Sequence, residues 1–124
     1  MQIHWCWRCR CDIPMLEDYE WAVVAKAHNA RADGDNAAAF SVLQESAQTL
    51  GLPAPIQPTD DTKPIAKAFW HLIAGYHMFT GVLEKSPNPI WHHVIGHHGP
   101  PCENCGKLLR TKRASYCVAC GAIR

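Results

Sequence analysis

The sequence lacks any apolar run of the roughly 18 to 20 residues that a membrane-spanning helix needs. Its first nine residues, MQIHWCWRC, also lack the basic region and apolar stretch of a secretory signal. The chain has no helical repeat and no low-complexity segment, and its 48% hydrophobic and 19% charged residues are typical of a folded protein. We therefore expect a cytoplasmic protein of 124 residues, folded as a single domain and not bound to membrane.

The motifs of several catalytic sites are missing as well. There is no Gly-rich phosphate loop, no nucleophile elbow and no H-E-x-x-H. Pro101-Cys102-x-x-Cys105 matches half of the zinc deaminase signature, but the half that carries the catalytic glutamate does not occur. His97 and His98 could serve a nuclease of the His-Asn-His type, but Gly-Pro-Pro and a cysteine pair follow where its metal-binding helix is needed. The sequence thus predicts no enzyme, with that nuclease as a remote alternative.

Cysteine is what the sequence does have, and most of its seven cysteines lie in closely spaced pairs. In a reducing compartment such pairs indicate metal ligands before disulfides. Cys102-Glu-Asn-Cys105-Gly and Cys117-Val-Ala-Cys120-Gly share one design, because two intervening residues let both sulfurs face one ion and the glycine permits positive φ. Residues 106–116 are long enough for a connecting β-hairpin. The pattern predicts a zinc ribbon, and the alternative is two unrelated buried or redox-active pairs.

A third pair, Cys6-Trp-Arg-Cys9, supplies two ligands of the four that a structural zinc needs. The other two could be local, from His4 or Cys11, or could come from the later histidine-rich stretch that holds His92, His93, His97 and His98. We predict a second zinc bound by Cys6, Cys9, His92 and His93, which would join the two ends of the chain, with Cys11 unligated. The alternatives are free surface thiols or a thioredoxin-like redox pair, whose βαβ context is missing.

Between the cysteine clusters the apolar spacing predicts three helices. The first opens at Pro14 and ends near Ala32, before a turn at residues 33–36. The second runs from a cap at Asn36 to Gly51, and after an exposed connector the third opens at Pro64 and fades at Gly81. The expected fold is α+β, with about three helices (residues 14–98) packed on the C-terminal four-cysteine zinc ribbon (residues 99–124). An N-terminal Cys/Trp arm (residues 1–13) docks against that ribbon.

The remaining histidines and tryptophans are expected to have structural roles. A single histidine in a helix is more often a packing or surface residue than a ligand, which applies to His28, His71 and His77. The three tryptophans beside candidate ligands are expected to shield a metal site, and any that proves exposed would instead anchor an interface; these are Trp5, Trp7 and Trp91.

Both ends of the chain carry a family resemblance. Asn88-Pro-Ile-Trp-His-His93 followed by Gly99-Pro-Pro-Cys-Glu-Asn-Cys-Gly-Lys-Leu-Leu-Arg-Thr-Lys-Arg-Ala114 resembles a set of small, largely uncharacterised bacterial zinc-ribbon proteins. Their N-termini are similar to Cys6-Trp-Arg-Cys9 followed by Ile13-Pro-Met-Leu-Glu17. The resemblance covers about a third of the chain and implies that the ends form one zinc-bearing unit, without implying an activity. Such proteins are similar to immunity proteins encoded beside antibacterial toxins.

Two functions follow from these patterns as hypotheses. The first is a protein-binding module, most concretely an immunity protein that neutralises a toxin, in which acidic residues mimic a polyanionic substrate: Glu17, Asp18, Glu20, Asp60 and Asp61. The second is a nucleic-acid-binding ribbon that uses the basic residues of the tail with Tyr116: Lys107, Arg110, Lys112 and Arg113. Residues 102–124 carry five basic residues and one acid, but four thiolates around Zn²⁺ reduce that +4 to about +2.

Overall fold

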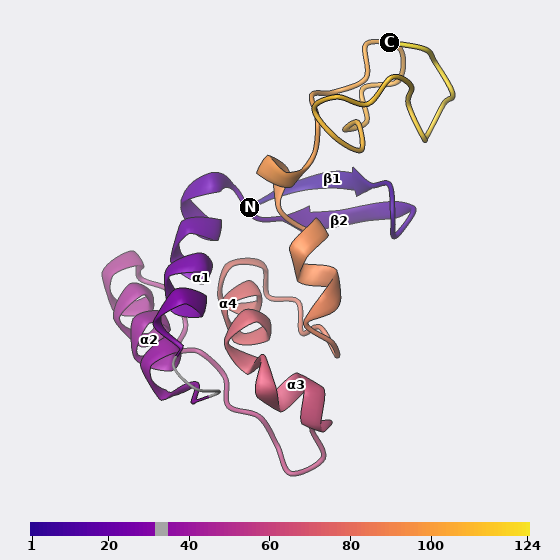
Figure 1. The fold of residues 1–124 in the computed structure, drawn as a ribbon. Helices are drawn as coiled ribbons and strands as arrows, with labels where there is room; N and C mark the ends of the chain where they lie inside the picture. The colour runs from indigo at the N-terminus through magenta and orange to yellow at the C-terminus, as the bar shows by residue number, and fades with distance from the viewer. Residues whose placement is uncertain (32–34) are drawn as a thin grey trace.

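A computed structural model describes residues 1–31 and 35–124 and shows the expected α+β fold. Figure 1 shows a two-stranded β-hairpin between a group of helices and the C-terminal ribbon. The elements are β1 Gln2–Cys6, β2 Cys11–Met15, α1 Asp18–Ala30, α2 Ala37–Leu50, α3 Pro64–Ala68, α4 Trp70–Thr80 and the 3₁₀ helices η1 Asn88–His92 and η2 Ile95–His97. No helix in the described ranges is both long enough and apolar enough to cross a bilayer.

The N-terminal arm is an antiparallel hairpin, in which pairing runs from Gln2 opposite Met15 to Cys6 opposite Cys11. The prediction that Pro14 opens the first helix is wrong, because Pro14 lies in β2 and its carbonyl accepts a hydrogen bond from the Tyr76 hydroxyl. A two-stranded sheet has only edge strands, where proline is tolerated.

Helix α1 begins four residues later than Pro14, after a capping box. The Glu17 side chain accepts from the backbone of Glu20, and the Glu20 side chain accepts from the N–H of Glu17 at 2.8 Å. This reciprocal pair satisfies two helix-start amides, so the acids rather than the proline set the start. The helix ends at Ala30; its predicted end near Ala32 and residues 33–34 of the predicted turn lie outside the described residues.

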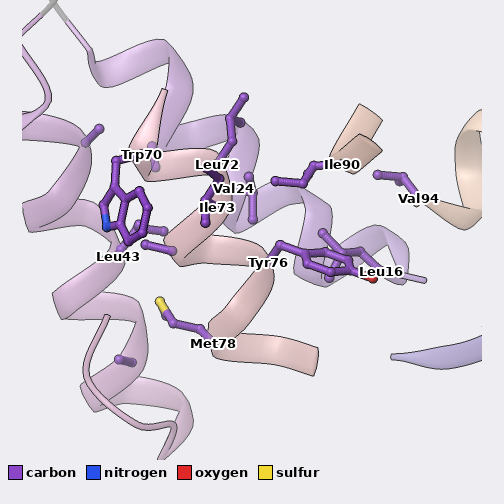
Figure 2. Close-up of a cluster of buried hydrophobic side chains, with 14 of the residues drawn as sticks. Leu16, Val24, Leu43, Trp70, Leu72, Ile73, Tyr76, Met78, Ile90 and Val94 are labelled. Atoms are coloured by element: carbon purple, nitrogen blue, oxygen red, sulfur yellow. The ribbon is translucent and has the colours of Figure 1, made fainter. Parts of the chain in front are cut away.

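Helix α4 forms the centre of the core, because its residues from Trp70 to Tyr76 are all buried. It packs between α1, α2 and the segment 90–94 (Figure 2). The crossing with α1 is close, since a Cβ on Gly75 would lie 2.9 Å from Val24 Cγ2. The main core cluster consists of Leu16, Val24, Ala27, Ala39, Leu43, Ala47, Ala66, Trp70, Leu72, Ile73, Ala74, Tyr76, Met78, Ile90 and Val94.

The predicted third helix is divided in two at Phe69, so the structure has four α-helices where about three were expected. Helix α3 contributes Ala66 to the main core, whereas its Ile65 is 54% exposed. The indole of Trp70, directly after the break, donates to the carbonyl of Ile56 at 2.7 Å. The connector 51–63 therefore lies against the start of α4, a tertiary contact that helical periodicity does not contain.

The predicted end of the second helix at Gly51 is confirmed, with φ of 68° at that residue. Asn36 stands at its N-cap position, but its side chain makes no cap hydrogen bond. Its amide instead donates to the carbonyls of Lys67 and Ala68 at 3.0 and 3.2 Å, and its side-chain oxygen accepts from Arg31 Nε. Asn36 thus joins three helices rather than capping one.

The C-terminal ribbon docks on the hairpin through both apolar and cation–π contacts. Leu108 packs with the buried Cys6 and Met15. The ammonium of Lys107 lies 4.9 Å from the Trp5 ring centroid, and the guanidinium of Arg110 lies 4.6 Å from the Trp7 ring, within the range of cation–π attraction. The predicted docking of arm on ribbon is therefore present.

The expected β-hairpin within residues 106–116 is not formed, because the described ribbon contains only two isolated antiparallel bridges. These bridges pair Pro101 with Leu108 and Tyr116 with Ile123, so each one closes a separate cysteine turn. Each knuckle is thus its own small hairpin, and the segment between them is a bend held by the fold around it.

Candidate metal centres

The first group of ligand atoms, here called the mixed centre, contains Cys6, Cys9, His92 and His93, the set predicted for a second zinc. Cys6 Sγ lies 3.7 Å from His92 Nδ1, and Cys9 Sγ lies 3.3 Å from His93 Nε2. All four ligand atoms lie within 4.8 Å of one another. A tetrahedral ion with bonds of about 2.3 Å to sulfur and 2.0–2.1 Å to nitrogen requires a sulfur–nitrogen edge of about 3.5 Å. The side chains are therefore already placed to hold a metal ion.

Two elements far apart in the sequence position these ligands. Cys6 ends β1 and Cys9 lies in the hairpin turn, whereas His92 ends η1. Leu16 fixes the distance between them, because its N–H donates to the His93 carbonyl at 2.8 Å and its carbonyl accepts from Ile95 at 3.0 Å. The mixed centre thus adjoins the main core, because the His93 ring lies 5.7 Å from the ring of Tyr76, while Cys6 belongs to a smaller cluster with Met15 and Leu108.

Adjacent histidines can serve one ion here because they present different nitrogens. His92 offers its near nitrogen, Nδ1, and His93 its far nitrogen, Nε2, with the two rings tilted by 58°. Burial is the main cause that lowers the pKa of His93 to about 4, and burial also lowers the pKa of His92. Both rings are therefore neutral near pH 7, the form that binds metal.

The Cys9 thiol of the mixed centre ionises less readily than a free thiol. Burial and the neighbouring Cys6 raise the pKa of Cys9 to about 11. Two thiolates side by side repel each other, and a bound divalent cation removes that penalty because its charge stabilises both. The chemistry of this ligand set therefore favours a metal over two free thiols.

Glu84 lies beside this centre, a neighbour that the sequence did not indicate. Its Oε1 lies 3.6 Å from His93 Nδ1, just beyond hydrogen-bond distance, and that buried nitrogen has no hydrogen-bond partner among the described residues. Carboxylates commonly hold the second nitrogen of a metal-binding histidine, which fixes the ring and strengthens the ligand. In the sequence, Glu84 is only an acidic residue in the segment between α4 and η1, with nothing to link it to His93.

Replacing Glu84 with glutamine is expected to weaken metal binding at the mixed centre by about 10- to 100-fold, because the amide is a weaker partner for the imidazole N–H. Competition with a chromophoric chelator measures the change, and Glu45→Gln on the exposed side of α2 is the matched control. An affinity equal to that of the control would show that Glu84 does not support His93.

The second group, here called the ribbon centre, contains Cys102, Cys105, Cys117 and Cys120, as the spacing predicts. The sulfurs of Cys102 and Cys120 lie 3.8 Å apart, and those of Cys105 and Cys117 lie 3.7 Å apart. A tetrahedral ion with metal–sulfur bonds of about 2.3 Å gives an edge of about 3.8 Å, so these four sulfurs also match a metal site.

The two ribbon knuckles have the predicted backbone geometry. Gly106 and Gly121 have φ of 78° and 79°, and their N–H groups donate to the carbonyls of Cys102 and Cys117, each at 2.8 Å. Asn104 donates to the sulfur of Cys120 and is the main cause that lowers the pKa of Cys120 to about 6. One thiol of this centre is thus disposed to ionise.

The hairpin turn is a third knuckle, which sequence reasoning missed. Arg10 N–H donates to the Cys6 carbonyl at 2.7 Å, as the glycines do in the ribbon, and Arg10 has φ of 54°. Arginine is costly in this left-handed region, by about 1 kcal/mol, so a search for C-x-x-C-G does not find this turn.

The other candidate ligands lie outside both centres. Cys11 is exposed on β2, and His4 bonds to the Gln2 side chain. His97 donates from Nδ1 to the carbonyl of Trp91 at 2.6 Å, and the buried His98 donates from Nε2 to the carbonyl of His92 at 2.7 Å. These two histidines shape the loop that carries the ligands.

Two histidines expected to stand alone form a pair instead. His28 Nδ1 lies 2.7 Å from His71 Nε2, with the rings stacked at 5.0 Å between α1 and α4. Burial, followed by the neighbouring His28 and Arg31, lowers the pKa of the fully buried His71 to about 4. His71 is therefore neutral at pH 7, and the pair packs between α1 and α4.

Acidification is expected to destabilise the fold through His71. Its pKa is about 4 when folded and about 6.5 when unfolded, so stability is full above pH 6.5 and falls as the pH approaches 4. The linkage gives a loss of about 2 kcal/mol between pH 7 and pH 5. Urea unfolding of wild type and His71→Leu at both pH values tests this, since the variant lacks that share of the pH dependence. Equal losses in both proteins would refute the assignment.

The tryptophans beside the ligands divide into two kinds. Trp5 and Trp7 are partly buried beneath Lys107 and Arg110, so they hold the ribbon as well as lying next to the mixed centre. Trp91 is 42% exposed although it precedes the candidate ligand His92.

Comparison with known proteins adds no assignment. No protein-family model matches the chain, and neither the curated proteins nor the solved structures give a significant match.

Proposed function

We propose that this protein is a non-enzymatic protein-interaction module stabilised by two zinc ions, and that its partner is a cognate antibacterial toxin. Sulfur and imidazole ligands in tetrahedral groups suit zinc. Each centre offers four protein ligands, the closed set of structural zinc, whereas a catalytic zinc keeps one position open for water. Metal analysis of purified protein is expected to give two zinc ions per chain.

The observation that carries the interaction role is the exposure of Trp91. Its ring packs edge-on against Trp21 at 5.3 Å, and Trp21 packs edge-on against His97 at 5.1 Å. The His97 ring is in turn bonded to the Trp91 carbonyl. These three residues, here called the aromatic face, contact one another before any partner binds, and His92, the residue after Trp91, belongs to the mixed centre. Exposed tryptophans are typical anchors of protein interfaces.

Charge supports a basic partner for this face. Residues 14–98 hold five basic and nine acidic residues, a formal charge of −4. The Asp18 carboxylate lies beside Gly96 in η2, next to the aromatic face, since a Cβ there would meet Asp18 Oδ1 at 2.7 Å. Glu20, expected to mimic a substrate, is only 2% exposed and caps α1, so it cannot contribute. Enzymes that act on polyanions have basic active sites, which an aromatic anchor beside the Asp18 carboxylate, on a helical body of net negative charge, would complement.

Co-expression with the toxin encoded by an adjacent gene tests this proposal. The chain is expected to restore growth and to form a complex in which Trp91→Ala weakens binding by about 30-fold or more, since anchors contribute about 2 kcal/mol or more. Leu50→Ala, which truncates an exposed apolar residue at the end of α2, is the matched control and should bind normally. Neighbouring genes without a toxin, or full protection by Trp91→Ala, would count against the assignment.

A further inference from the structure

Charge is strongly segregated between the two parts of this chain. Residues 1–13 and 99–124 together hold seven basic and two acidic residues, a formal charge of +5, against −4 for residues 14–98. Zinc in the ribbon centre with four thiolates contributes about −2, and zinc in the mixed centre with two thiolates is neutral, which leaves about +3. The arm and ribbon therefore keep a positive field after metal binding.

The fold joins the cations of the arm to those of the ribbon. Arg110 lies on Trp7, the residue before Arg8, and Lys107 lies on Trp5 of the same hairpin. Six exposed side chains in these adjoining segments, here called the basic face, are Arg8, Arg10, Lys107, Arg110, Lys112 and Arg113. In the ranges 1–31 and 35–124 none of the six forms an ion pair with a carboxylate. Their charge is thus available to an external anion.

The presence of arginine at position 10 also indicates an anion-binding role. Three knuckles in this chain need a left-handed residue after the second cysteine, and two of them have glycine there. The third has Arg10, at φ of 54°, where an arginine side chain gains nothing for the turn. A residue that opposes the local backbone preference is expected where its side chain has a function. For the exposed guanidinium of Arg10, that function would be to bind an anion.

We propose that the basic face binds the phosphate backbone of single-stranded nucleic acid. Aromatic rings among the cations favour single strands, whose unpaired bases can stack: Trp7 is partly exposed, and Tyr116 on the ribbon is 54% exposed. The six cations lie in turns, bends and irregular segments of the described chain rather than on a helix or long β-ribbon, so no element carries them into a major groove. This surface shares no residue with the aromatic face and does not depend on a toxin partner.

Fluorescence anisotropy of the zinc-loaded full chain with a labelled 20-nucleotide oligo-dT tests the proposal. With three to four phosphates neutralised, the logarithm of the binding constant should fall with the logarithm of salt concentration at a slope of about −2 to −3. A 20-base-pair duplex should bind more weakly than the single strand. Trp91→Ala should bind the oligonucleotide normally, which separates this proposal from the protein-binding role.

Two variants give the decisive comparison. Arg10→Gly is expected to lower oligonucleotide affinity several-fold while its thermal midpoint stays equal or rises, because the glycine relieves the turn. Arg113→Glu, in an exposed bend, should lower the affinity further, and Lys26→Glu on α1 is the matched control. No binding at 50 mM salt, duplex binding as tight as single-strand binding, or an equal loss for Lys26→Glu would each overturn the proposal.

Discussion

Replacing Cys6 with serine is expected to release one of two metal ions and to lower the thermal midpoint of the helical body by more than about 10 °C. The mixed centre joins residues 86 positions apart in the sequence, and closing a loop of that length accounts for about 4–5 kcal/mol in the chain-entropy model. For a chain of this size each kcal/mol shifts the midpoint by roughly 3–5 °C. The Cys6 side chain is also fully buried beside Met15 and Leu108, so the hairpin loses its anchor together with the metal.

Cys117→Ser is expected to behave differently, although it also removes a buried ligand. The ribbon centre lies in its own small cluster with Leu109, apart from the main core. Its loss should unfold residues 100–124 locally and leave the midpoint of the helices within a few degrees of wild type. Zinc content per chain and helical circular dichroism during heating distinguish the two variants.

Cys11→Ser is the matched control for Cys6→Ser. Cys11 pairs with Cys6 across the hairpin but is exposed and outside both centres, so this variant should keep two metals and the wild-type midpoint. If Cys117→Ser lowered the helical midpoint as far as Cys6→Ser, the two centres would not have separate structural roles. If Cys11→Ser lost a metal, the ligand set of the mixed centre would be wrong.

The parts of this structure that the sequence predicts well depend on local chemistry. The ribbon glycines mark left-handed turns wherever a knuckle closes, and Gly51 and Gly81 end α2 and α4 at φ of 68° and 75° for the same steric reason. Counting ligands indicates that Cys6 and Cys9 need two partners for a structural metal, but it does not choose His92 and His93 over His4, Cys11, His97 or His98. The glycine turns need only local spacing, whereas the choice among those partners depends on the fold.

The parts that sequence reasoning missed depend on contacts between distant residues. Pro14 looks like a helix start until β1 is present to pair with it, and an arginine at position 10 hides a turn that the mixed centre imposes. The break at Phe69 follows from the contact of Trp70 with the connector. The link from Glu84 to His93 spans two separate loops. Periodicity and propensity describe one segment at a time, so they contain none of these pairings.

Gly99→Ala is expected to displace residues 109–111 at the base of the ribbon and so to loosen the neighbouring contacts of Leu108 and Arg110 with the hairpin, whereas Gly96→Ala should be nearly neutral. A Cβ at position 99 would lie 2.2 Å from the carbonyl oxygen of Thr111, which is backbone and cannot rotate away. The Gly99 N–H also donates to the Leu109 carbonyl at 2.8 Å, so relief of the clash breaks that bond. At position 96 the Cβ meets only the end of the Asp18 side chain, which can turn aside.

This loosening should be visible without loss of the ribbon metal, because both knuckles close locally and their four sulfurs do not depend on the hairpin. Trypsin should therefore cut the Gly99→Ala ribbon after Lys107 or Arg110 sooner than it cuts wild type, since these cations leave Trp5 and Trp7. The tryptophan fluorescence should shift to the red as the two rings become hydrated, and zinc content should stay at two per chain. An overpacked backbone contact costs about 1–3 kcal/mol or more, enough to shift the short segment that carries Leu108 and Arg110 away from the hairpin. If trypsin cut Gly99→Ala no faster than wild type, the contacts of the ribbon with the hairpin would not protect Lys107 and Arg110. The arm and the ribbon would then not form one basic surface.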